Sequence, residues 1–233
     1  MVNKQDPALQ TKLYEYLAQF ITENKRTKIE EIVQQRTRYL TLVLEDIYQP
    51  HNASAVLRTC ECFGIQDVHI IENRNKYTVN PDVVMGSTKW MNLIKYNGSE
   101  NNTPAALRAL KSKGYRIVAT TPHPGKDCDI LNLDLEKGKV ALVMGTEIDG
   151  ITQDVFEMAD EFVKIPMYGF TESFNISVSA AMCLHTLSNK LRGGSIPWQL
   201  SQEEQFCLRM EWVKNVLTKP ELVEEEFWKQ EGL

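Results

Sequence analysis

Three segments of the sequence carry polar side chains of the kinds that act in catalysis. The first is HNASAVLRT at 51–59, directly after a predicted strand. Open α/β sheets bind ligands at the carboxyl ends of their strands, so this position suits a functional site. Asn52 is equally suited to cap the following helix, and Arg58 to form a surface salt bridge. The pattern alone leaves both interpretations open.

The second segment, ALVMGTEIDG at 141–150, runs from an apolar strand into a turn. Gly145 permits close approach of the backbone and Gly150 a tight turn, so a structural role explains both glycines. It does not explain Glu147, which follows the carboxyl end of the strand. The spaced glycines of a dinucleotide-binding fingerprint are missing. Their absence argues against a nucleotide-dependent oxidoreductase.

The third segment, IPMYGFTESFNISVS at 165–179, begins where a predicted strand ends at Pro166. Ser173 and Asn175 stand before a helix, where a capping role is the plain alternative to a functional one. Small residues follow at the start of this helix. They permit a close helix contact, for which a partner subunit is a candidate.

Strands alternate with helices along most of the chain, which predicts a parallel sheet covered by helices on both faces. Thr103 is predicted to cap a helix with Pro104 at its first position, and Gly64 and Gly114 to follow helix ends. The strands are expected at 39–47, 67–72, 93–96, 115–121, 139–145 and 161–167. The helices are expected at 7–35, 52–63, 80–91, 103–113, 152–159, 175–192, 201–218 and 220–230.

The composition is that of a soluble globular protein, with 42% hydrophobic and 24% charged residues. No signal peptide is evident and no apolar run is long enough to cross a bilayer, so the cytoplasm is expected. Five cysteines and four histidines show neither a disulfide framework nor the spacing of a metal site. The net charge of −5 does not by itself indicate binding to nucleic acid.

The three segments together resemble the signature motifs of the SpoU/TrmH family of SPOUT methyltransferases. They match as N-x-x-A-x-x-R-T, M-G-x-E-x-x-G-I and I-P-M-x-G-x-x-x-S-x-N-x-S-V-S, in the family's order, within about residues 38–192. Each motif is modest alone, but three in order on an α/β chain are specific.

The resemblance implies an α/β fold with a deep C-terminal trefoil knot at about 165–192, which forms the pocket for S-adenosylmethionine and a homodimer contact. It also implies a methyltransferase domain at 38–194, between short helical extensions at 1–37 and 195–233. No metal or membrane is implied. The residues that match the cofactor-binding positions are Thr120, Gly145, Ile165, Met167 and Phe174.

The implied reaction is methylation of a ribose 2′-hydroxyl in RNA. The resemblance makes Arg58 central to activating this hydroxyl. It gives supporting positions to Asn52, Glu147, Ser173 and Asn175. The chain departs from the family in having Glu172 where glutamine is frequent, Phe174 in place of leucine, and an acidic C-terminal extension, which puts substrate choice in doubt more than chemistry.

The RNA substrate is expected to be tRNA. About 37 residues precede the first predicted strand, too few for the L30e-type RNA-binding domain frequent in the ribosomal RNA enzymes of the family. Short helical extensions at both ends resemble the family's tRNA enzymes that methylate the D-loop guanosine at position 18. Ribosomal RNA methylation, and a non-catalytic RNA-binding or assembly factor on the same fold, are the alternatives.

Overall fold

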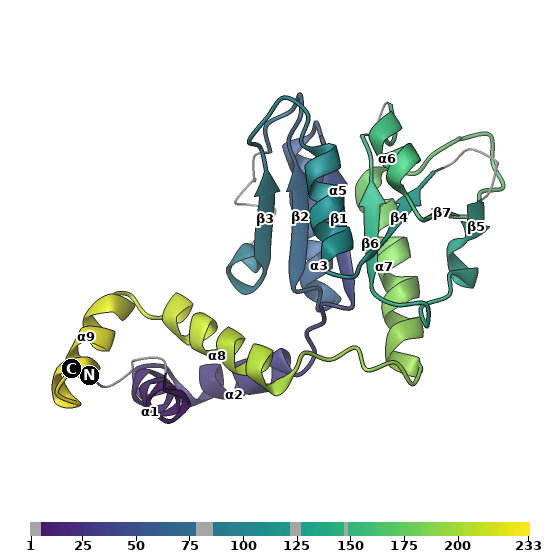
Figure 1. Ribbon diagram of the computed structural model, residues 1–233. Coiled ribbons are helices and arrows are strands. Elements are labelled where there is room, and N and C mark those ends of the chain that lie inside the picture. Colours follow the sequence, from purple (N-terminus) through teal and green to yellow (C-terminus); the bar gives the residue numbers. More distant parts are fainter. Residues whose placement is uncertain (1–5, 78–85, 122–126, 147–148) are drawn as a thin grey trace. The chain divides into compact units, whose positions relative to one another are not determined.

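The computed structural model describes residues 6–77, 86–121, 127–146 and 149–233 (Figure 1). The chain forms two compact units. One is the sheet unit, Thr37–Trp198, and the other is the helical unit, which combines Met1–Arg36 with Gln199–Leu233.

The sheet unit contains a seven-stranded sheet in the order β3-β2-β1-β6-β4-β7-β5, and all its strand pairs are parallel. Every residue of β1 and β6 is buried, as expected for central strands covered on both faces. This confirms the predicted sheet. The strands are β1 Leu40–Glu45, β2 Asp67–Ile71, β3 Asn92–Tyr96, β4 Arg116–Thr120, β5 Asp127–Asp129, β6 Val140–Met144 and β7 Glu161–Lys164.

Helices cover both faces of this sheet, with α3 and α7 on one face and α5 and α6 on the other (Figure 1). Alternate residues of β1 separate the two layers: Leu42 and Leu44 belong to the core with α3 and α7, and Val43 to the core with α5. The helices are α3 Pro50–Cys62, α5 Thr103–Ser112, α6 Gln153–Met158 and α7 Ile176–Gly193.

Several elements differ from the sequence-based expectation. The first half of the predicted helix at 80–91 lies outside the described residues, and in its second half Ser87–Trp90 form the 3-10 helix η1. Strand β5 and the 3-10 helix η2, Ile130–Asn132, were not expected. Thr103 is not a cap, because Asn102 holds that position and the Thr103 hydroxyl donates to Glu45 instead.

The helical unit contains α1 Pro7–Ala18, α2 Glu23–Val33, α8 Gln202–Val216 and α9 Pro220–Gln230. The single helix predicted at 7–35 is wrong, because α1 ends at Ala18 and Thr22 caps a new helix by accepting from the Lys25 amide. Helices α8 and α9 pack against α1, and α8 also against α2. No helix among the described residues is both long and apolar enough to span a membrane.

Polar contacts join the two ends of the chain inside the helical unit. Glu30 on α2 accepts hydrogen bonds from Tyr14 on α1, at 2.5 Å, and from Arg209 on α8, at 3.1 Å. The buried Arg36 guanidinium lies 5.6 Å from the ring centre of Trp212. Terminal segments that are far apart in sequence therefore stabilise one another.

Candidate active site

Three neighbouring strands bring predicted cofactor-binding residues to one edge of the sheet. Thr120 ends β4, Gly145 follows β6 and Ile165 follows β7, and these strands are adjacent and parallel. The Thr120 hydroxyl donates to the Val143 carbonyl at 3.2 Å, and the Thr121 amide donates to the Val163 carbonyl at 3.0 Å, so these contacts join the ends of the three strands. The edge is the one where open α/β sheets bind ligands.

The loop after β6 forms a closed turn, called here the 145–150 turn. The Thr146 amide donates to the Gly150 carbonyl at 2.8 Å, and the Gly150 amide to the Thr146 carbonyl at 3.2 Å. A Cβ atom on Gly145 would lie 2.1 Å from the Gly150 oxygen, and Gly150 has a φ of 70°. Both glycines are therefore required by the turn, as predicted. Glu147 lies outside the described residues.

Asn52 and Asn175 meet, although they belong to different sequence motifs. The Asn175 side-chain amide donates to Oδ1 of Asn52 at 3.2 Å, and the Asn52 amide donates to Gln49 at 3.1 Å. Asn175 also caps α7 by accepting from the Ser177 amide, which confirms that alternative for this residue. Asn52 is not a cap, because α3 already begins at Pro50 and buries Asn52 in its first turn.

Arg58 lies on α3 with its side chain exposed. It forms no ion pair and no hydrogen bond with any other described residue, so the structure gives no support to the surface salt bridge. The exposed guanidinium can approach a phosphate or a ribose from outside the chain.

The segment between β7 and α7 holds the remaining predicted site residues. Ile165 and Met167 are half-buried, while Ser173 is exposed and Phe174 is 41% exposed. Tyr168 and Phe170 are almost fully exposed, at 97% and 108%. The apolar side chains of this segment are thus available to a ligand or partner.

Two acidic residues at the end of β1, Glu45 and Asp46, were not singled out from the sequence. Both are buried, and Asp46 is the only described residue other than glycine at a positive φ, 54°. Burial alone would raise the pKa of Asp46. Hydrogen bonds from the Asn75 and Asn73 amides and from Arg74 outweigh burial, so this pKa is lowered. The available signal was an acidic pair closing an otherwise apolar strand.

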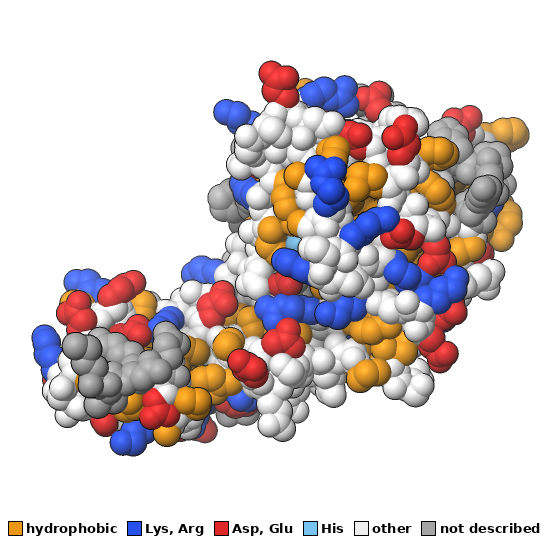
Figure 2. All heavy atoms as spheres, viewed as in Figure 1, with side chains coloured by type: hydrophobic (Ala, Val, Ile, Leu, Met, Phe, Trp, Pro, Cys, Tyr) orange, Lys and Arg blue, Asp and Glu red, His pale blue; other side chains and the backbone are white. Residues whose placement is uncertain are grey.

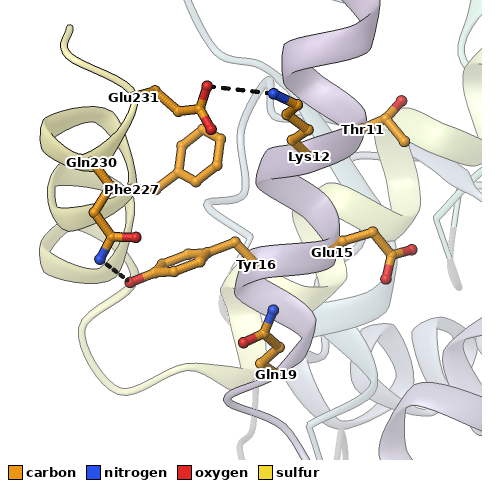
Figure 3. Close-up of a pocket in the computed structure, with 8 residues that line it drawn as sticks. All are labelled: Thr11, Lys12, Glu15, Tyr16, Gln19, Phe227, Gln230 and Glu231. Carbon is orange, nitrogen blue, oxygen red and sulfur yellow. Dashed lines mark hydrogen bonds and ion pairs between the residues drawn. The ribbon is translucent and has the colours of Figure 1, made fainter.

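A cavity of about 330 Å³ lies between α1 and α9 in the helical unit (Figure 3). Gln230 donates to the Tyr16 hydroxyl and Lys12 pairs with Glu231 beside it. None of its lining residues is a predicted site residue. In the described part of the chain, no group of three His, Cys, Asp or Glu residues is placed to hold a metal.

On the face of the sheet unit seen in Figure 2, basic and acidic side chains are mixed. Figure 2 shows Lys and Arg side chains scattered over the visible face of the sheet unit, with acidic side chains between them. Several basic residues are already paired, such as Lys111 with Asp160 and Arg116 with Glu161. This agrees with the expectation from sequence that composition alone cannot place RNA on the protein.

The chain matches known proteins over most of its length. It is 46% identical over 208 residues, 89% of this chain and 93% of the relative, to a tRNA (guanosine(18)-2'-O)-methyltransferase from Borreliella burgdorferi. The solved TrmH/SpoU tRNA modifying enzyme of Aquifex aeolicus is 26% identical, with a TM-score of 0.73 over 84% of this chain and 98% of that chain.

A more distant structure shares the fold. The SpoU methyltransferase AviRb from Streptomyces viridochromogenes, solved in complex with AdoMet, is 20% identical, with a TM-score of 0.58 over 70% of this chain and 62% of that chain. The family model described as the SpoU rRNA methylase family matches residues 39–185, which include all three motifs and lie within the sheet unit. The chain therefore belongs to the SpoU methylase family.

Proposed function

We propose that the chain transfers a methyl group from S-adenosylmethionine to a ribose 2′-hydroxyl of tRNA, at the D-loop guanosine that names its Borreliella burgdorferi relative. The observation that carries this proposal is the hydrogen bond between Asn52 and Asn175. This bond joins the first and third motifs across 123 residues. A shared site requires such a contact, whereas two side chains that only capped separate helices would not need to meet.

The residues at the edge of the sheet fit S-adenosylmethionine. Thr120, Gly145 and Ile165 lie at the ends of adjacent parallel strands, where backbone amide and carbonyl groups would suit the polar edge of an adenine ring. Met167 and Phe174, in the segment between β7 and α7, would supply apolar surface for the methionine portion. When bound, the cofactor supplies a methyl group attached to a sulfonium sulfur. This sulfur leaves readily as a neutral thioether, so the transfer needs no metal.

The side chains of the chain would orient the ribose and relieve its hydroxyl of a proton, because an alcohol is a poor nucleophile. Arg58 has the exposure to bind the substrate phosphate and to orient the hydroxyl, whose proton passes to the phosphate or to solvent as the methyl group is transferred. Asn52 and Asn175 hold each other next to the start of α7, and Ser173 lies two residues before Asn175. Glu147 is proposed to help keep Arg58 in place.

We also propose a homodimer through the knot region. Val178 and Met182 lie one turn apart on α7 and are 45% and 37% exposed, an apolar stripe suited to a second helix. The methyltransferase domain would comprise 38–194, with the knot at 165–192, and the two extensions would assist in holding tRNA. We also propose that the protein is cytoplasmic, where it would meet a tRNA substrate.

The test is methyl transfer from labelled S-adenosylmethionine to unmodified tRNA and ribosomal RNA transcripts, with nucleoside mass spectrometry of the products. We expect 2′-O-methylguanosine in the tRNA D-loop. Label in ribosomal RNA alone would keep the enzyme class and overturn the tRNA substrate. Cofactor binding without transfer to either RNA would favour the non-catalytic factor.

A further inference from the structure

Glu45 is a buried acidic residue that the proposed chemistry does not use. It ends β1 and is fully buried. Its carboxyl group accepts three hydrogen bonds and forms no ion pair with a described residue. A buried carboxyl group that is satisfied only by hydroxyl and amide donors requires all of them in place. Losing one donor leaves a buried acceptor unpaired, which is destabilising.

The donors come from two separate places in the fold. The Thr103 hydroxyl, at the start of α5, donates to Oε1 at 2.6 Å. The Thr152 hydroxyl donates to the same oxygen at 2.6 Å, and the Thr152 amide to Oε2 at 3.0 Å. Thr152 caps α6 and stands two residues after Gly150. Glu45 therefore anchors the exit of the 145–150 turn.

A second attachment reaches the same turn from the neighbouring residue, Asp46. Its Oδ1 accepts from three successive backbone amides, at 73–75, and Arg74 donates to Oδ2 at 3.2 Å. Arg74 also donates to Asp149 at 3.1 Å, and the Asp149 amide donates to the Thr146 hydroxyl at 2.9 Å. The Arg74–Asp149 pair is mostly exposed, so the Glu45 contact contributes the larger share of the attachment.

We propose that Glu45 is a positioning residue, which acts through Thr152 to hold the exit of the 145–150 turn at Gly150 and so keeps Gly145 in place against the cofactor. Its catalytic consequence rests on the proposed function, but its structural consequence does not. The end of β1 leads directly to α3, so one strand end aligns the turn with the helix that carries Asn52 and Arg58.

Two threonines provide a matched comparison. Each hydroxyl donates to Oε1 of Glu45 at 2.6 Å, and each accepts one further bond, Thr152 from the Val155 amide and Thr103 from the Asn73 side chain. Thr152→Val and Thr103→Val therefore each remove two hydrogen bonds, the one donated to Glu45 and the one accepted by the hydroxyl. Only Thr152 adjoins the turn.

The experiment measures hydrogen exchange at the Thr146 and Gly150 amides, and the affinity for S-adenosylhomocysteine, in the full-length protein. For Thr152→Val we expect exchange at these amides to accelerate about tenfold. We expect cofactor affinity to fall roughly fivefold, because the Gly145 backbone loses its fixed position. Thr103→Val should leave the exchange rates and the cofactor affinity within about twofold of the wild-type values, despite a similar fall in Tm. Thr152→Ser, which keeps the hydroxyl, should restore both.

Equal exchange at the turn in the two valine variants would overturn the positioning role. So would a Thr152→Val variant that loses stability but keeps wild-type exchange. If the wild-type protein neither binds S-adenosylhomocysteine nor methylates RNA, the proposed function fails, while the exchange contrast still decides whether Glu45 holds the turn.

Discussion

The end of β1 and the segment between β7 and α7 lie at the same edge of the sheet, yet they are built in opposite ways. Glu45 and Asp46 are buried, and the chain itself supplies every hydrogen bond described for them. Tyr168 and Phe170 expose nearly their whole side chains. Buried carboxyl groups must be satisfied from within, whereas exposed aromatic rings gain most when another molecule covers them.

The comparison indicates that one region of the candidate site maintains its structure and the other contacts what binds. The internal contacts at β1 hold the exit of the 145–150 turn through Thr152, and the exposed segment and Arg58 remain available to a molecule that binds from outside. A preorganised framework that meets a ligand through a few exposed groups loses little conformational entropy on binding. Four predictions test this division.

The largest effect is expected from Arg58→Ala. Because Arg58 is exposed and without a described partner, the variant should fold and bind S-adenosylhomocysteine like the wild type. Methyl transfer should fall about a thousandfold, since the group that acts on the hydroxyl is lost. Single-turnover assays on a tRNA transcript measure this, with cofactor affinity as control. Near-normal turnover would remove Arg58 from the mechanism.

Asp46→Ala tests the buried region. It removes the acceptor of three backbone amides and places alanine at a φ of 54°, so the free energy of unfolding should fall by about 4 kcal/mol. Urea unfolding measures the change. Asp46→Asn keeps an acceptor oxygen and tolerates this backbone conformation, so it should cost clearly less. Equal losses in the two variants would contradict the assigned contacts.

His69, on the strand beside β1, predicts a pH dependence of stability. Burial lowers its pKa from 6.5 to about 4 in the folded protein. The unfolded chain therefore takes up a proton first, and stability should fall as the pH drops from about 6.5 to about 4, by about 3 kcal/mol. Urea midpoints across this range test it against His69→Gln, which should flatten that part of the profile.

The smallest effect on stability is expected in the exposed segment. Replacing Phe170 with serine should change the free energy of unfolding of the dilute protein by less than about 0.5 kcal/mol, since its ring has no burial to lose. A loss that appears only at high protein concentration would indicate that a second copy covers the ring. A large fall in the free energy of unfolding at every protein concentration would contradict the exposure of Phe170. It would also weaken the contrast between this segment and the buried end of β1.

Much of the sheet unit could be predicted because its signals are local. Alternating strands and helices, and glycines after helix ends, require only near neighbours in sequence, and they were sufficient for the parallel sheet. The break between α1 and α2 was not predicted, because the apolar pattern continues through Phe20 although Thr22 caps a new helix. Strand β5, of three residues, is too short for periodicity to reveal.

The sequence by itself determined the fold class and, through three motifs, the family and the side chains available for chemistry. The tertiary structure alone decided which of them meet. Asn52 contacts Asn175 across 123 residues, and Glu45 gathers Thr103 and Thr152 across 58 and 107. A hydrogen bond forms only when donor and acceptor are placed to within a few tenths of an ångström of the right separation. Only the folded sheet sets those distances, because residue types and their spacing carry no information about them.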